Sequence, residues 1–143
     1  ACHLRVAADS AKMGQPEINL GLIPGFGGSQ RLLRLAGRAA ALELCLLGAP
    51  ITAERALQLG IVNKVVSAAE LEAETQKLAE RLASAAPLAL RGTLDIINVG
   101  GECGIEEGLQ YESAQFGLMF ATDDMREGTR AFLERRKPEF AGR

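Results

Sequence analysis

Three short segments in the first half of the chain have side-chain patterns typical of β-strands. In residues 3–9, HLRVAAD, apolar and polar residues alternate, and this period of two predicts a strand. Residues 11–17, AKMGQPE, predict a second strand, which either ends at Pro16 or lies at a sheet edge, because proline has no N–H to donate to a ladder. Residues 61–66, IVNKVV, are rich in β-branched side chains and predict a third strand.

Glycines divide the residues between these segments into a loop and three short helices. Residues 18–28 hold four glycines and one proline, a composition that predicts a loop. Helices are expected over residues 29–37 and 38–48, each ending at its glycine. A third helix is expected over residues 52–60, with Thr52 as its N-cap.

From residue 67 onward, apolar residues recur at helical spacing instead. Ser67 and Glu70 have the spacing of a capping box, which predicts a helix start. Leu71, Leu78 and Leu82 then fall on one side of that helix. A face this apolar needs another protein surface to cover it, so these helices are candidates for oligomerisation.

Three more helices are expected in the remainder of the chain. One opens at Pro87, a second covers residues 104–120, and a third covers residues 122–140, which begin with acids and end with bases as the helix dipole favours. The sequence therefore predicts two regions, a mixed α/β region over residues 1–66 and an all-helical region over residues 67–143.

Composition and charge restrict the class of protein. The chain has 143 residues, of which 48% are hydrophobic and 24% charged, so it can bury a core. The net charge of -2 argues against a nucleic-acid partner, and the 4% aromatic content with no tryptophan argues against stacking on single strands. No apolar run approaches the length that spans a membrane.

The cysteines and the single histidine offer no metal motif. Cys2, Cys45 and Cys103 are odd in number and contain no C-x-x-C pair, so we expect thiols that are mostly buried, in a reducing compartment. His3 is the sole histidine, so no histidine-rich metal set is expected.

Glu17 is the first candidate for chemistry. It is the only charged residue between Lys12 and Arg31, in a segment of apolar residues and glycines. One interpretation is a loop carboxylate that caps a turn or pairs with an arginine. The other is a general acid or base, because apolar surroundings disfavour the charged form of a carboxylate.

The glycines of residues 25–28, GFGG, are the second candidate. Their spacing does not fit G-x-G-x-x-G, and no Lys-Ser/Thr pair follows as in a phosphate-binding loop, so nothing supports NAD or ATP. They form either a tight turn into a helix or a place where backbone N–H groups approach a ligand.

Three segments resemble the enoyl-CoA hydratase/isomerase (crotonase) family. Residues 11–37, AKMGQPEINLGLIPGFGGSQRLLRLAG, resemble the family pattern F/M-G-x-P-E-x-x-L-G-x-x-P-G-x-G-G-x-Q-R-L. Residues 49–66, APITAERALQLGIVNKVV, are similar to the pattern A-x-x-A-x-x-x-G-L-V, and residues 120–140, FATDDMREGTRAFLERRKPEF, are similar to the family's C-terminal signature. The resemblance runs over residues 1–143 and covers only the second half of a family member.

The resemblance implies a fold and a reaction. The fold is α/β: the second half of a crotonase-like ββα spiral core over residues 1–66, then a C-terminal helical trimerisation region over residues 67–143. The implied activity is hydration of trans-2-enoyl-CoA to 3-hydroxyacyl-CoA, as in fatty acid β-oxidation. Coenzyme A enters as part of the thioester substrate, and no separate cofactor is implied. A homotrimer or dimer of trimers is implied, in a bacterial-type cytoplasm or a mitochondrial matrix.

The resemblance also gives roles to four residues. Glu17 is expected to be one of two glutamates that position water and shuttle a proton. The backbone of Gly25 is expected to contact the catalytic water, and Phe116 and Arg135 lie where the family's C-terminal helices meet coenzyme A.

Parts of the family's site fall outside this sequence. The second glutamate and both oxyanion donors belong to family segments that precede Ala1, so a 143-residue piece alone is expected to be inactive. Enoyl-CoA isomerase or another acyl-CoA dehydratase of the same superfamily is the alternative activity. A non-catalytic oligomerisation fragment is the alternative from another class of protein.

Overall fold

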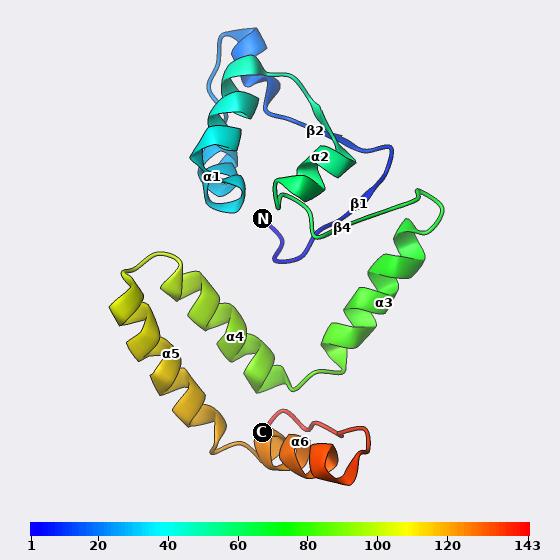
Figure 1. Cartoon of the computed structure of the whole chain (residues 1–143), viewed down its shortest axis with the longest axis vertical. Coiled ribbons are helices and arrows are strands. Elements are labelled where there is room, and N and C mark those ends of the chain that lie inside the picture. Colours follow the sequence, from blue (N-terminus) through cyan, green and yellow to red (C-terminus); the bar gives the residue numbers. More distant parts are fainter. The chain divides into compact units, whose positions relative to one another are not determined.

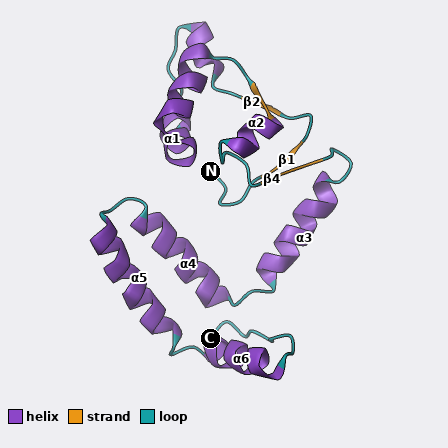
Figure 2. Ribbon diagram, in the orientation of Figure 1, coloured by secondary structure: helices purple, strands orange, loops and turns teal.

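The computed structural model describes residues 1–143, which divide into two compact units, Ala1–Gln76 and Lys77–Arg143. Helices account for most of the chain, and the strands are very short (Figure 2). No helix combines the length and apolar character that crossing a membrane requires.

The strands of the first unit form two separate pairs. β1 (Val6–Ala8) runs parallel to β4 (Lys64–Val66) (Figure 1). β2 (Lys12–Met13) runs antiparallel to β3 (Ile51–Thr52). The three predicted strands are present but shorter than expected, and β3 was not predicted. One reason is that the Asn63 side chain accepts the Arg5 N–H at 2.8 Å, where a longer β1–β4 ladder would need a backbone partner.

A 3₁₀ helix, η1 (Pro16–Leu20), occupies part of the segment expected to be a loop. Pro16 suits its first position because proline fixes φ and needs no partner for an N–H. The helix ends at Gly21, whose φ of 70° lies in the left-handed region. The prediction of a loop is therefore wrong for residues 18–20, where the turn begun by Pro16 continues to Leu20, and confirmed for residues 21–27.

α1 (Gly28–Leu47) contains both of the helices expected after the glycines. At Gly37 the backbone leaves helical geometry, with φ 78° and ψ 169°, so α1 consists of two helices joined across a kink. The second ends at Gly48, whose φ is 62°. The prediction of two helices, each ending at a glycine, is confirmed.

α2 (Ala53–Gln58) begins as predicted, because Thr52 Oγ1 accepts the Arg55 N–H at 3.2 Å. Its alanines pack against the strands, and a second apolar cluster lies along α1. The first cluster contains Ala7, Ala53, Ala56 and Val62, and the second contains Leu32, Ala41 and Leu44. No large side chain is fully buried, so the core of this chain is small.

α3 (Leu71–Ala83) starts without the expected capping box. The Ser67 hydroxyl donates to the Glu70 carboxylate at 2.6 Å, so these side chains bond to each other rather than to backbone N–H groups. The Glu70 carbonyl instead accepts the Glu74 N–H at 2.9 Å and opens the helix.

The second unit contains α4 (Pro87–Gly100), α5 (Ile105–Met119) and α6 (Asp123–Glu134). α4 and α5 lie side by side (Figure 1). Proline at the start of α4 is confirmed, and Thr122 caps α6 by accepting the Met125 N–H at 3.1 Å. The expectation that the last helix continues to residue 140 is wrong, because Arg135 turns left-handed with φ 55° and ends α6 before the basic residues.

The cysteines are more exposed than expected. Cys2 and Cys103 are exposed, and only Cys45 is partly buried. Cys2 lies before the first strand and Cys103 in the turn between α4 and α5, and neither position is covered within this chain.

Candidate active site

The Glu17 side chain projects from η1, which packs against α1. Glu17 is half-buried. Asn19 fixes η1 in place, because its side-chain amide donates to the Gly48 carbonyl at 3.2 Å. A Cβ on Gly48 would lie 2.7 Å from Ile18 Cγ2, so the glycine that ends α1 also permits this close approach. Glu17, the candidate acid–base residue, is thus carried by a short helix whose position is fixed by contacts with Gly48 at the end of α1.

Gln15 is the polar partner of Glu17. With its amide nitrogen facing the carboxylate, Gln15 donates to both Glu17 Oε1 and Oε2 at 3.2 Å. The opposite orientation would place the amide oxygen against two carboxylate oxygens, with no proton between them. No motif or periodicity in the sequence shows that the Gln15 amide, two residues away, turns toward Glu17.

The Cys45 thiol on α1 lies within electrostatic reach of Glu17. Burial raises the pKa of the Cys45 thiol, and the negative charge of Glu17 raises it further. Both effects favour the neutral form of the thiol.

The apolar residues that follow Glu17 do not enclose it within this chain. Leu20, Leu22, Ile23 and Phe26 are all exposed, and Phe26 is completely so. The expectation that these neighbours would form an apolar environment is therefore wrong for the chain by itself, because the turn after η1 directs them outward.

Gly25 lies in the turn that leads into α1. Its carbonyl accepts the Gly28 N–H at 2.9 Å, and Gly27 is left-handed with φ 75°. The Arg31 guanidinium folds back to donate to the Phe26 carbonyl. Gly25 is exposed. A chain of contacts connects it to Glu17: Gly28 bonds to Gly25, and the Gln15 amide lies between Gly28 and the Glu17 carboxylate.

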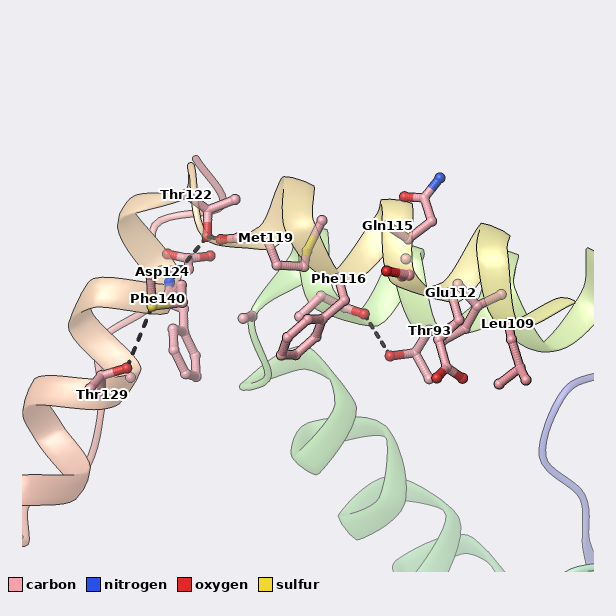
Figure 3. Close-up of a pocket in the computed structure, with 17 residues that line it drawn as sticks. Thr93, Leu109, Glu112, Gln115, Phe116, Met119, Thr122, Asp124, Thr129 and Phe140 are labelled. Carbon is pink, nitrogen blue, oxygen red and sulfur yellow. Dashed lines mark hydrogen bonds between the residues drawn. The ribbon is translucent and has the colours of Figure 1, made fainter. Parts of the chain in front are cut away.

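Phe116 lies in the second unit, in α5, beside an open cavity of about 740 Å³. Its ring meets Phe120 edge to face, with the ring centres 5.2 Å apart. Residues of α4, α5, α6 and the tail after α6 line this cavity, and Figure 3 shows Thr93, Phe116, Thr129 and Phe140 among them. The Phe116 side chain is 65% exposed, so it is available for contact.

Arg135 ends α6 and is exposed. Its neighbour Arg136 makes the ion pairs at this end of the helix, to Glu127 at 2.6 Å and to Glu134 at 2.6 Å. Arg135 therefore turns the chain, while Arg136 fixes the tail that follows.

The tail after α6 is also held by Asp124, a residue that no pattern in the sequence marks. Asp124 is only 4% exposed, and its carboxylate accepts the N–H groups of Ala141 and Gly142 at 2.6 and 2.9 Å. Glu127 accepts the N–H of Glu139 at 3.0 Å. These contacts fold the tail back along α6.

The residues singled out from the sequence thus fall into two groups. Glu17 and Gly25 belong to the first unit, and Phe116 and Arg135 to the second. No group of three or more His, Cys, Asp and Glu side chains is arranged to hold a metal ion.

Comparison with known proteins decides the family. The enoyl-CoA hydratase/isomerase family matches residues 1–143, the whole chain rather than a part of it. The chain belongs to this family. The predicted resemblance is therefore confirmed, and the P-E-x-x-L-G-x-x-P-G-x-G-G segment that contains Glu17 lies within the family match.

Individual relatives agree with the assignment to the hydratase/isomerase family. The short-chain-enoyl-CoA hydratase of Clostridium acetobutylicum is 42% identical over 97% of this chain and 53% of its own length. The crotonyl-CoA hydratase of Syntrophomonas wolfei is 46% identical over 97% of this chain and 54% of its own length. The crystal structure of an enoyl-CoA hydratase from Bacillus anthracis, 39% identical, matches 99% of this chain and 55% of its own, with a TM-score of 0.96.

The chain is thus similar in structure to crotonase-fold proteins along its whole length, yet it spans only about half the length of these relatives. The fold neighbours share its α/β character, and within this chain the fold is mostly helical.

Proposed function

We propose that this chain supplies the C-terminal half of an enoyl-CoA hydratase, which adds water to trans-2-enoyl-CoA to give 3-hydroxyacyl-CoA. The observation that carries the proposal is the environment of Glu17. Its carboxylate is half-buried on η1, faces the Gln15 amide and lies inside a sequence segment typical of the family. The relatives that carry hydratase names support the choice of reaction.

In the proposed reaction, Glu17 acts as a general acid or base. Water adds across the double bond, so that its oxygen bonds to Cβ of the enoyl group and a proton reaches Cα. Glu17 and a second glutamate, in a segment of the full-length protein outside this chain, position the water and move its proton. Such proton transfer contributes roughly 10²- to 10⁴-fold to a rate.

The remaining site residues have binding roles in this proposal. The Gly25 backbone contacts the catalytic water, and its exposed position in the turn before α1 leaves it accessible. Phe116 and Arg135 are exposed on the second unit and contact the coenzyme A part of the substrate. Two backbone N–H groups outside this chain form the oxyanion hole that stabilises the thioester enolate.

We also propose that residues 67–143 form an oligomerisation region of a homotrimer or a dimer of trimers. The exposed apolar side chains of its helices support this assignment, among them Ile105, Phe132 and Leu133. Because apolar surface of this kind is rarely left uncovered in a soluble oligomer, a subunit interface is the natural use for it.

The activity is tested by incubating the full-length protein with short trans-2-enoyl-CoA and following the loss of the conjugated thioester. Hydratase activity predicts formation of 3-hydroxyacyl-CoA, with oxygen from isotopically labelled water in the product. Conversion of a 3-enoyl-CoA to the 2-enoyl isomer, without hydration, would overturn the proposal in favour of an isomerase. The 143-residue chain alone is expected to be inactive, because it lacks the second glutamate and the oxyanion hole.

A further inference from the structure

The amide of Gln15 occupies the space between Glu17 and the start of α1. On one side, with its nitrogen turned toward Glu17, the orientation that pairs a donor with the carboxylate, it donates to Oε1 and Oε2, each at 3.2 Å. On the other side it lies against Gly28, where a Cβ would come within 2.7 and 2.9 Å of the two terminal amide atoms. Gln15, Glu17 and Gly28 therefore form one contact set, although Gly28 is distant from the other two in sequence.

We propose that Gln15 is a positioning residue for Glu17, and that residue 28 is a glycine so that the Gln15 amide can reach the carboxylate. This inference rests on the proposed function, because it takes Glu17 to be the acid–base group. It assigns to one glycine of the GFGG segment a role that differs from contact with a ligand.

The backbone on both sides of Gln15 is held, so its side chain starts from a defined point. A Cβ on Gly14 would lie 3.1 Å from Pro50 Cα, which shows how closely this segment approaches the connection between α1 and β3. Pro16 follows at once and fixes its own φ. With Cα of Gln15 fixed, few rotamers bring the amide to both Glu17 oxygens.

Position 28 requires a glycine because the Gln15 amide occupies the space of a Cβ, and not because the backbone needs a left-handed φ. Gly28 is the first residue of α1, and its φ lies outside the left-handed region that favours glycine. Any side chain would therefore be tolerated by the main chain, but its Cβ would collide with the Gln15 amide. Because that amide is the end of a flexible side chain, an alanine would displace the amide rather than the fold.

Loss of the amide would leave the Glu17 carboxylate free to rotate. A donor that contacts both oxygens holds the plane of a carboxylate, and acid–base catalysis depends on such orientation. Gln15 acts on the reaction only through Glu17, so its side chain need not touch the substrate.

The test is a double-mutant cycle in the full-length protein, with Gln15→Ala, Gly28→Ala and the double variant. We expect each single variant to lower kcat for enoyl-CoA hydration by about 10- to 100-fold while KM stays within about 2-fold, because orientation and not binding is lost. We expect the double variant to be no slower than Gln15→Ala, since the new Cβ acts only through the amide.

Two matched variants control for general effects. Gln30→Ala removes another glutamine amide near the start of α1, and Gly117→Ala adds a Cβ at a helical position with nothing within 4 Å. Both are expected to keep the native kcat. The thermal midpoint of Gly28→Ala is expected to stay near the native value.

The outcomes separate this inference from the proposed function. If Glu17→Gln is slow but Gln15→Ala keeps the native kcat, the inference is overturned and the proposed function stands. The same holds if Gly28→Ala and Gln15→Ala act additively, since the glycine would then act independently of the amide. If Glu17→Gln keeps the native rate, the proposed function itself fails.

Discussion

At the scale of single residues, the carboxylates that matter in this chain are held by N–H donors. Glu17 is held by the Gln15 amide, Asp124 by two backbone N–H groups of the tail, and Glu127 by Arg136 and a backbone N–H. Such N–H donors fix the orientation of a carboxylate. Asp124 and Glu127 hold the tail after α6, whereas Glu17 is the carboxylate proposed for acid–base chemistry.

Glu127 gives a prediction for pH dependence. The hydrogen bond from Arg136, with that from the Glu139 N–H, lowers the pKa of Glu127 from 4.5 to about 2. A folded pKa below the ordinary value stabilises the folded state at pH values above about 4.5, and this contribution is lost as the pH falls toward 2. We expect the Glu127 carboxyl to show no protonation step between about pH 6 and 3.5 by NMR.

The variant Arg136→Gln should return the Glu127 midpoint toward 4.5, because the largest cause of the shift is removed. Arg126→Gln is the matched control, since Arg126 pairs with Asp123 at 3.0 Å and should leave Glu127 unchanged. A Glu127 midpoint near 4.5 in the native chain would show that the tail is not held as described.

At the scale of elements, glycines and caps determine where the helices begin and end. Thr52 and Thr122 each accept a backbone N–H at a helix start, and Gly48 ends α1 in the left-handed region. The kink at Gly37 sets the direction of the second half of α1, which carries Cys45 and ends beside η1. α1 therefore begins at the turn that contains Gly25 and ends at Gly48, which contacts the short helix that carries Glu17.

The variant Gly37→Ala is expected to lower the free energy of unfolding by about 1–3 kcal/mol, because φ 78° with ψ 169° is a conformation essentially restricted to glycine. A Cβ there would meet nothing within 4 Å, so the cost is one of backbone strain alone. Urea unfolding of the full-length protein measures it. Gly117→Ala, inside α5, is expected to be neutral or stabilising by up to about 1 kcal/mol. Equal effects of the two substitutions would argue against the kink.

The elements also show how far the sequence predicts this structure. Helices were predicted well, because their apolar spacing, Thr52, Pro87 and the terminal glycines are local signals. The strands were overestimated in length and β3 was missed, because pairs of two or three residues depend on a distant partner.

The candidate site was predicted only as far as its motif. Glu17 and Gly25 follow from the resemblance, but the contact between Gln15 and Gly28 and the anchoring of the tail by Asp124 are tertiary. Nothing in their local sequence distinguishes these residues from ordinary polar and loop positions. The exposed Cys2 and Cys103 were misjudged because burial of a thiol depends on neighbouring elements.

At the scale of the whole molecule, the chain exposes far more apolar surface than it buries in large side chains. No large side chain is fully buried, whereas many leucines, isoleucines and phenylalanines are exposed in both units. The chain also spans only about half the length of its relatives. Both observations support the proposal that these faces are covered in the full-length, assembled protein.

Light scattering of the full-length protein tests that proposal. We expect a mass of about three or six times that of one subunit, because a closed symmetric assembly covers equivalent faces on every copy. The double variant Phe132→Glu with Leu133→Glu should shift the mass toward the monomer if this exposed face is an interface, and Lys137→Glu, at another exposed position, should not. A monomeric native protein would contradict the oligomerisation role of residues 67–143.

We propose above all that Glu17 carries out acid–base chemistry on an enoyl-CoA thioester. The most direct measurement is kcat for hydration of a short trans-2-enoyl-CoA by the full-length protein and its Glu17→Gln variant. We expect a loss of about 10²- to 10⁴-fold in kcat with an unchanged fold, because an amide of the same shape cannot exchange the proton. A variant that hydrates at nearly the native rate would contradict it.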